Sequence, residues 1–379
     1  MNATTTAAGA NRDSLRKTAA RAATAMWRPT WLYALAMCVL PMLVGAGCAQ
    51  APVNARAVST NEAKLVWPHP PATPRVRFVR NVATPADWGV SAGPFQHLVD
   101  KLTGRTPFRF VRPTGVAARG TILYIADPGA QVLFVLDSAS AHELEIRSVG
   151  VEKLTSPVAV ALGPGNAVFL VDSALRKVFV LDAQGRLLRT IGGEGRLARP
   201  AGVAYDAAAD RLYVSDSATH RIIIFAADGR MLGSFGSNGS DPGEFNFPTH
   251  LALTRDGRLL VTDTLNFRVQ VLAPDGSPLA QFGRVGDGSG DFASPKGVAV
   301  DSTGNIYVVD ALFDAVQVFR RDASLLLGFG ERGTRPGQLW LPTGLFIDAN
   351  DMLYVADSYN QRISIFERLR PSGPQIEEP

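Results

Sequence analysis

The chain has 379 residues, with 38 Lys and Arg, 34 Asp and Glu and two cysteines, and 46% of its residues are hydrophobic. This length is sufficient for a sizeable core, and so few cysteines exclude a disulfide-rich scaffold. Residues 1–47 hold five of the basic residues and one of the acidic residues, which leaves 33 of each in residues 48–379. We therefore expect no nucleic-acid partner, although a local basic patch is compatible with a neutral total.

The first segment, residues 1–47, has the features of a secretion signal. A basic stretch precedes residues 31–47, which are apolar without a charge and end in small residues before Cys48. This order resembles a bacterial lipoprotein signal, and the resemblance implies cleavage before Cys48 and attachment of lipid to its thiol. The segment departs from the usual pattern at Gly45, where such signals have leucine.

This departure leaves alternatives for residues 1–47. Ordinary signal-peptide cleavage after a small residue is one, and retention as a membrane anchor is another. Residues 31–47 number 17, the lower limit for a spanning helix, and Pro41 weakens such a helix. Translation that starts at Met26 instead of Met1 would give a signal of ordinary length, so both starts remain open.

Cysteine usage favours the lipid anchor. Removal of the signal also removes Cys38, so the mature chain would keep only Cys48 and form no internal disulfide. We expect a periplasm-facing protein of the bacterial cell envelope. Ala49 after Cys48 favours the outer over the inner membrane.

Three further segments precede the repeats described next. Residues 48–74 are rich in Ala and Pro and predict a tether. Residues 75–82 alternate charged and apolar side chains, which predicts a strand. Residues 94–102 have apolar side chains at helical spacing, which predicts a short amphipathic helix that covers one face of the domain or binds a partner.

The rest of the chain repeats one pattern six times. Each copy has a proline, a short apolar run, a second run that ends in aspartate, and a third run, separated by turn residues. Short strands at a period of 40 to 50 residues predict a β-propeller, here all-β with six blades of four antiparallel strands. Because the sixth copy lacks a fourth strand, we expect residues 75–82 to close the ring. The repeat prolines are Pro113, Pro157, Pro200, Pro248, Pro295 and Pro342.

A cation stands five residues after the aspartate in four copies. A carboxylate that ends one strand and a base that begins the next can pair across the turn and fix the register, so we interpret these pairs as structural. A cation-binding ring of carboxylates is the alternative. The pairs are Asp172 with Lys177, Asp216 with Arg221, Asp263 with Arg268, and Asp357 with Arg362.

The copies resemble NHL repeats, at Gly297 to Asp301, at Leu353 to Ser358 and at Thr219 to Ile222. The resemblance covers about residues 112–367 and implies a six-bladed propeller of the NHL or TolB-like type. The domain is expected at 75–367, with a disordered tail at 368–379. The copies lie near residues 112–155, 156–198, 199–246, 247–293, 294–340 and 341–367.

The connectors before the last three copies share three glycines and one apolar residue, which we expect to fill the space between blades. These apolar residues are Phe245, Phe292 and Leu339. The connector Gly283 to Pro295 also contains Asp287 and Asp291, but it lacks the ligand pattern of a calcium loop, so no metal site is predicted there.

One ring position suggests a functional site. The residue two places after each repeat proline is small in five copies and is His250 in the fourth. Lys296 precedes the equivalent glycine of the next copy, so His250 and Lys296 could bind an anion at the mouth of the central channel. One histidine is too few for a zinc site, and no metal or cofactor is predicted.

We therefore expect a binding or scaffold module that recognises a protein, peptide or glycan, and we identify no catalytic residue. The alternative is a metal-dependent hydrolase or lyase with its site in the channel near His250, because propeller lyases that resemble NHL proteins use channel histidines.

Overall fold

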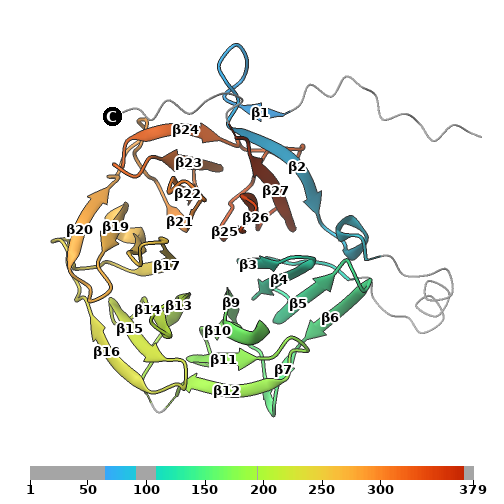
Figure 1. Ribbon diagram of the computed structural model, residues 1–379, viewed down its shortest axis with the longest axis vertical. Helices are drawn as coiled ribbons and strands as arrows, with labels where there is room; N and C mark the ends of the chain where they lie inside the picture. The colour runs from blue at the N-terminus through green and yellow to red at the C-terminus, as the bar shows by residue number, and fades with distance from the viewer. Residues whose placement is uncertain (1–64, 91–107, 194, 371–379) are drawn as a thin grey trace, which may run out of the picture. The chain divides into compact units, whose positions relative to one another are not determined.

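Six small antiparallel sheets surround a common centre, as the period of the repeats predicts (Figure 1). The computed structural model describes residues 65–90, 108–193 and 195–370. These residues belong to one compact unit, Asn61–Pro379. The all-β prediction is confirmed, since the only helical segments among the described residues are the short 3-10 turns η1 (Pro85–Trp88), η2 (Pro164–Asn166) and η3 (Thr264–Asn266).

Each blade has its first strand at the centre of the ring and its fourth at the rim. The first strands are β3 (Gly115–Arg119), β9 (Pro157–Leu162), β13 (Pro200–Asp206), β17 (Pro248–Leu253), β21 (Pro295–Val300) and β25 (Leu345–Ile347). The second strands all end on the repeat aspartate and are β4 (Ile122–Asp127), β10 (Val168–Asp172), β14 (Arg211–Asp216), β18 (Leu259–Asp263), β22 (Ile306–Asp310) and β26 (Met352–Asp357).

The third and fourth strands complete the blades. The third strands are β5 (Val132–Asp137), β11 (Lys177–Leu181), β15 (Arg221–Ala226), β19 (Arg268–Leu272), β23 (Ala315–Phe319) and β27 (Arg362–Arg368). The fourth strands are β6 (His142–Ile146), β12 (Leu187–Gly192), β16 (Met231–Phe235), β20 (Pro278–Phe282), β24 (Leu325–Phe329) and β2 (Val76–Val82). A small hairpin of β7 (Ser148–Val149) and β8 (Glu152–Lys153) connects blades 1 and 2.

Burial falls from the second strand of a blade to its fourth. All five residues of β10 are buried, whereas four of the five residues of β20 are exposed. The two neighbouring blades cover both faces of a second strand, so nearly all of its side chains are buried and its sequence is a continuous apolar run. The core is therefore a set of apolar layers between blades. Phe245, Phe292 and Leu339 are fully buried in the layers that join blades 3 and 4, 4 and 5, and 5 and 6.

The N-terminal strand closes the ring, as predicted. β2 pairs antiparallel with β27, and Phe78 lies opposite Phe366 with their ring centroids 5.6 Å apart. A fifth strand, β1 (Val66–Trp67), pairs with β2, and Trp67 packs on Phe366 and Phe329 with centroids 5.8 Å away in both cases.

The segment 48–74, interpreted as a tether, thus contributes a strand to blade 6. The folded unit begins before Arg75 because the Trp67 side chain is large enough to cover the outer edge of this blade. Residues 1–64 lie outside the described residues. The same holds for the helix expected at 94–102 and for residues 371–379 of the expected tail.

Candidate functional site

The six repeat aspartates share one role, which is to accept backbone N–H groups. All six carboxylates are fully buried. Each accepts hydrogen bonds from one or two N–H groups just before the first strand of its own blade, for example Asp310 from Ala293 and Ser294 at 2.7 and 3.0 Å. Asp127 does the same with Val111 and Arg112. The carboxylate therefore fastens the connector that enters a blade to the second strand of that blade.

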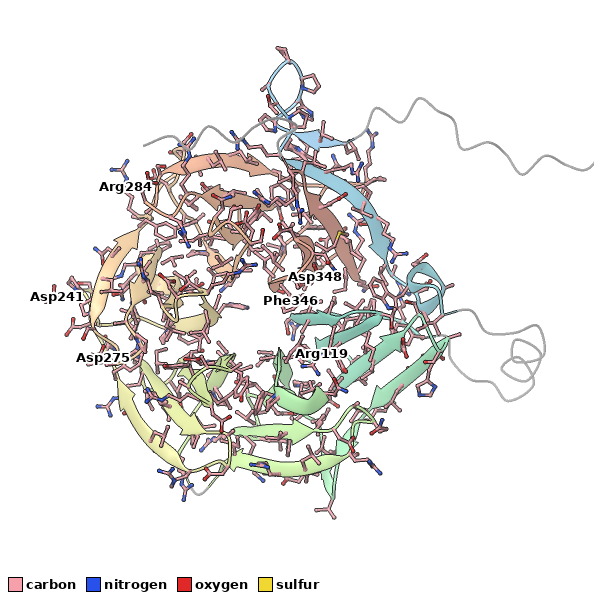
Figure 2. The ribbon with its side chains drawn as sticks, in the orientation of Figure 1. Arg119, Asp241, Asp275, Arg284, Phe346 and Asp348 are labelled. Atoms are coloured by element: carbon pink, nitrogen blue, oxygen red, sulfur yellow. The ribbon has the colours of Figure 1, made fainter. Side chains whose placement is uncertain are left out.

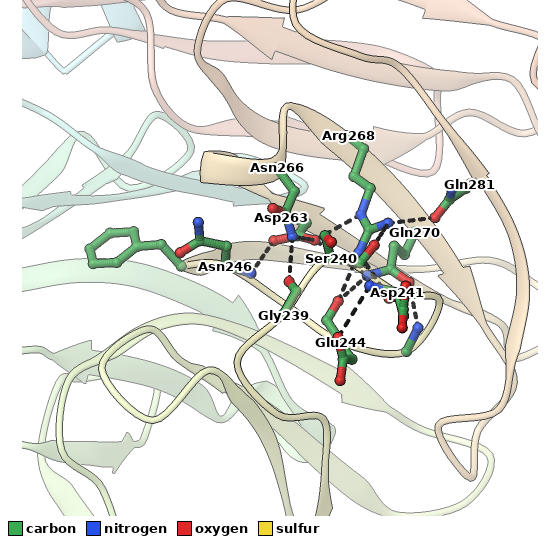
Figure 3. A network of polar contacts seen from close by, with 12 residues as sticks. Gly239, Ser240, Asp241, Glu244, Asn246, Asp263, Asn266, Arg268, Gln270 and Gln281 are labelled. Carbon is green, nitrogen blue, oxygen red and sulfur yellow. Dashed lines mark hydrogen bonds and ion pairs between the residues drawn. The ribbon is translucent and has the colours of Figure 1, made fainter.

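Blades 4 and 6 add a buried arginine to this arrangement, and Figure 3 shows the network of blade 4. Arg268 Nε lies 2.9 Å from Asp263 Oδ2, and its terminal nitrogens donate to the carbonyls of Ser240, Asp241 and Glu244. Asn266 donates to Asp263 and to the Gly239 carbonyl, both at 2.8 Å. Arg362 forms the same contacts with Asp357 and with the carbonyls of Thr334, Arg335 and Gln338. Each arginine thus binds a whole connector as well as its aspartate.

Blades 2 and 3 differ from the pairing expected at this position. Lys177 lies opposite Asp172 in the register, but its ammonium pairs with Glu152 of β8 at 2.7 Å. Arg221 lies opposite Asp216 and is exposed. Asp172 and Asp216 accept hydrogen bonds from backbone N–H groups alone, so their hydrogen bonding does not depend on an adjacent cation.

The ring of small residues marks the closest approach of neighbouring innermost strands. A Cβ atom on Gly202 would lie 2.1 Å from the Thr249 carbonyl oxygen, and one on Gly344 would lie 2.1 Å from that of Thr114. Gly115 and Gly297 also face the backbone of the next blade. Their small size is therefore required by packing between blades.

His250 occupies this position in blade 4. Its Nδ1 lies 3.1 Å from Thr249 Oγ1, which in turn lies 2.8 Å from Thr264 Oγ1. The side chain is half-buried, and desolvation together with the nearby Lys296 ammonium lowers the pKa of His250 to about 3. The imidazole is thus neutral near neutral pH and can act as either donor or acceptor.

Lys296 is the neighbouring charged group, on the innermost strand of blade 5. Thr262 Oγ1 donates to its backbone carbonyl at 2.8 Å and so fixes the strand. Burial lowers the pKa of the Lys296 ammonium, and the Asp310 carboxylate partly offsets this effect. Within the part of the chain that the structure describes, no carboxylate lies within ion-pairing distance of Lys296. The structure thus brings His250 and Lys296 together as a neutral donor or acceptor beside an unpaired cation.

Sequence reasoning missed the hydroxyl groups that connect the innermost strands. Ser215 donates to the Thr249 carbonyl at 2.5 Å, and Ser358 donates to that of Pro113 at 2.6 Å. Thr264 donates to the Pro295 carbonyl at 3.1 Å. In the sequence these hydroxyl groups are visible only as a Ser or Thr beside the repeat aspartate in blades 3, 4 and 6. Such residues are common in turns, so the sequence alone does not indicate contacts between blades.

A second missed residue is Phe346, near the centre of the ring (Figure 2). The residue four places after the repeat proline is alanine in the other five copies. Phe346 packs against the apolar layers around blade 1, and its ring centroid lies 6.1 Å from that of Tyr354. Blade 6 thus has an aromatic ring where the other five innermost strands have a methyl group.

Comparison with protein families gives a match to the NHL repeat at residues 197–225 and 245–272. These two segments hold the second strands and aspartates of blades 3 and 4. The chain contains NHL repeats. A comparison with curated proteins found no significant match.

Solved structures similar to this NHL propeller have low sequence identity and therefore show the fold alone. A gluconolactonase from Xanthomonas campestris has a TM-score of 0.54 at 17% identity and covers 69% of this chain and 87% of its own. A protein of unknown function from Bacteroides thetaiotaomicron has a TM-score of 0.54 at 19% identity, with coverage of 68% and 70%. A streptogramin B lyase has a TM-score of 0.52 at 12% identity, with coverage of 69% and 94%.

The described residues of the NHL propeller offer neither a clustered set of metal ligands nor a membrane-spanning helix. They contain no group of three or more His, Cys, Asp or Glu side chains arranged to hold a metal ion. In residues 65–90, 108–193 and 195–370, no helix is long and apolar enough to cross a bilayer. Cys48, the expected lipidation site, lies outside these residues.

Proposed function

We propose that this chain is a lipid-anchored module of the bacterial cell envelope, whose NHL propeller binds a protein, peptide or glycan partner through an anionic group of that partner. The observation that carries the proposal is Lys296, a half-buried ammonium near the centre of the ring with no carboxylate among the described residues at ion-pairing distance.

The electrostatics of this position favour an anion. Desolvation lowers the pKa of Lys296 because the buried ammonium has lost water contacts without gaining a direct ion pair. A carboxylate or phosphate from a ligand would replace that solvation with a charge-assisted hydrogen bond. His250 stays neutral beside it and can give the same anion a second hydrogen bond.

Binding can be tested with a capture experiment in which only this position is changed. Purified lipid-free propeller would be cross-linked mildly to solubilised envelope fractions, as wild type, Lys296→Met and Lys153→Met. Lys153 is an exposed lysine of β8, so its replacement controls for loss of one positive charge. We expect one specific partner with wild type and Lys153→Met and its loss with Lys296→Met. Equal capture by all three proteins, or none by any, contradicts the proposal.

The sequence before the propeller supports the anchor. Residues 31–47 are uncharged and apolar and directly precede Cys48, and 17 residues separate that cysteine from β1. Mass spectrometry should find a diacylglyceryl-modified Cys48 at the N-terminus, and Cys48→Ser should move the protein from the membrane fraction to the soluble fraction. An unmodified Cys48 thiol in the processed chain would contradict lipid anchoring and leave the binding proposal standing.

A second candidate function is a metal-dependent hydrolase or lyase with His250 in its site. It is favoured by the neutral state of His250, which is the metal-binding form, and by the enzymes among the similar structures, a streptogramin B lyase and a gluconolactonase. Metal analysis of the purified propeller separates the two candidates. A stoichiometric metal that is lost in His250→Gln supports the enzyme, and its absence supports the binding module.

A further inference from the structure

Blades 4 and 6 each hold a guanidinium group, and blade 5 lacks one at the same place. Arg268 donates to three connector carbonyls at 2.6 to 3.1 Å, and Arg362 does so at 2.7 to 3.2 Å. The position 47 residues after Arg268 and 47 residues before Arg362 is Ala315. The first residue of β23 therefore lacks the side chain that fills this place in the two neighbouring blades.

The connector before blade 5 nevertheless has the same backbone hydrogen bonds. Phe292 N donates to the Arg284 carbonyl at 2.8 Å, as Phe245 N does to that of Ser237, and Asp291 N donates to the Gly288 carbonyl at 3.1 Å. A parallel bridge joins Val285 to Phe292, as equivalent bridges do in the other two connectors. The carbonyls of Asp287, Gly288 and Asp291 thus take the positions of those that bind Arg268.

A glutamine holds this conformation without the arginine. Gln317 accepts from Gly290 N at 3.1 Å and donates to the Asp291 carbonyl at 2.7 Å. Gln270 makes the same two contacts in blade 4, at 2.9 and 2.6 Å. The connector of blade 5 therefore keeps the backbone conformation of the blade-4 connector, although Ala315 supplies no guanidinium group to its carbonyls.

The surroundings of Ala315 hold a buried carboxylate and leave open space at the neighbouring strand. Asp310 is fully buried and accepts hydrogen bonds from backbone N–H groups, and among the described residues no cation pairs with it. Gly328 replaces Gln281 of blade 4, and a Cβ added there would meet only the Val316 carbonyl oxygen, at 3.9 Å. Phe313 stands at the position of Asn266, two residues before Ala315.

We propose that the blade-5 slot, formed by the carbonyls of Asp287, Gly288 and Asp291 with Asp310 and Ala315, binds the guanidinium group of an arginine side chain from a peptide or protein. A planar guanidinium offers five N–H donors, and in blades 4 and 6 this group satisfies three carbonyls and one carboxylate at once. A lysine ammonium has three donors in another geometry and cannot reproduce the set. The ring of Phe313 can add a cation–π contact with the ligand.

The test uses two blocked peptides, acetyl-Ala-Arg-Ala-amide and acetyl-Ala-Lys-Ala-amide, titrated against the folded propeller by calorimetry and NMR. We expect saturable 1:1 binding of the arginine peptide, at least tenfold tighter than binding of the lysine peptide. The variant Ala315→Arg with Phe313→Asn restores the residues of blade 4, and Ala315→Met fills the slot with an uncharged side chain. Both should abolish binding, and melting temperatures show that they fold.

Two further variants test whether the arginine peptide binds at this slot and not elsewhere on the molecule. Lys153→Met should leave the affinity for the arginine peptide unchanged, because Lys153 is an exposed residue of β8, outside blade 5. Arg268→Ala should create a second slot and raise the stoichiometry to two. Equal affinity for both peptides, binding that persists in both filled-slot variants, or saturable calcium binding in place of the arginine peptide would each overturn the proposal.

Discussion

Arg362 and Asp357 form an ion pair that is almost fully removed from solvent, with Nε and Oδ2 2.7 Å apart and side-chain exposures of 9% and 0%. The remaining donors of Arg362 are taken by connector carbonyls 24 to 28 residues earlier in the chain. The pair therefore joins the turn between β26 and β27 to the segment that enters blade 6. Arg268 has the same role in blade 4.

Replacement of Arg362 by alanine should destabilise the propeller strongly. The change removes the charged partner of Asp357, which keeps only Trp340 N, Asn360 Nδ2 and Ser364 Oγ as donors, and it removes a donor from three carbonyls. Removal of one partner of a buried ion pair costs about 3–5 kcal/mol. Arg230→Ala is the matched control, because Arg230 and Asp228 are exposed and 3.9 Å apart, and a cost within about 0.5 kcal/mol is expected. Urea unfolding measures the free energy of unfolding of both variants and of the wild type. Similar losses for the two variants would show that the Arg362 contacts contribute little.

Gly202→Ala should destabilise the contact between blades 3 and 4. Its Cβ would lie 2.1 Å from the Thr249 carbonyl oxygen, so the innermost strands must separate, at a cost of about 1–3 kcal/mol. Gly233→Ala in the outermost strand of blade 3 meets no atom within 4 Å and should be neutral or slightly stabilising. Thermal unfolding of the two variants gives the comparison. A Gly202→Ala protein as stable as Gly233→Ala would contradict the close approach of the innermost strands.

His250 should make stability depend on pH. Burial and the Lys296 ammonium lower its pKa from 6.5 to about 3, so between these values the unfolded chain binds a proton that the folded chain does not. This contribution is fully present above about pH 6.5 and falls as the pH decreases, by up to about 1.4 kcal/mol per pH unit. Urea unfolding at about pH 7 and about pH 5 should therefore show a smaller loss for His250→Gln than for wild type. Parallel losses in the two proteins would mean that His250 titrates normally.

Stepwise N-terminal truncation should separate the two strands added to blade 6. A chain that begins at Arg75 lacks β1 and loses the contacts of Trp67 with Phe329 and Phe366, so a moderate decrease in melting temperature is expected. A chain that begins at Ala83 also lacks β2 and exposes the edge of β27, so cooperative unfolding should be lost or the melting temperature should fall sharply. An unchanged melting temperature for the second truncation would contradict closure of the ring by β2.

Much of this architecture could be predicted from local sequence signals. Pro248 and Pro295 begin innermost strands, and Asp263 and Asp310 end second strands, because short apolar runs between turn residues report strand boundaries directly. The missing fourth strand of the last copy predicted the place of β2. The strand β1 was missed because two residues within a Pro-rich stretch carry too little pattern to be recognised.

The candidate site was less predictable because its contacts join distant segments. A spacing of five residues indicated that Arg268 could pair with Asp263, but not that its other donors bind carbonyls 24 to 28 residues earlier. The same spacing suggested Asp172 as the partner of Lys177, whereas Glu152 lies on a hairpin whose position depends on packing between blades 1 and 2. The proximity of His250 and Lys296 followed from the repeat register, but the lowering of their pKa values depends on burial, which the sequence does not give.

The pairing of β2 with β27 also has a consequence for how the ring assembles. Phe78 and Phe366 are opposite each other in the sheet although almost the whole domain separates them along the chain. During synthesis β2 leaves the ribosome before any complete blade, and its partner β27 is made only after the strands of the other five blades. Contacts of such high sequence separation slow folding because loop closure must precede the gain from pairing. The nascent chain must therefore carry β2, with its alternating charged and apolar side chains, without its partner until β27 has been synthesised.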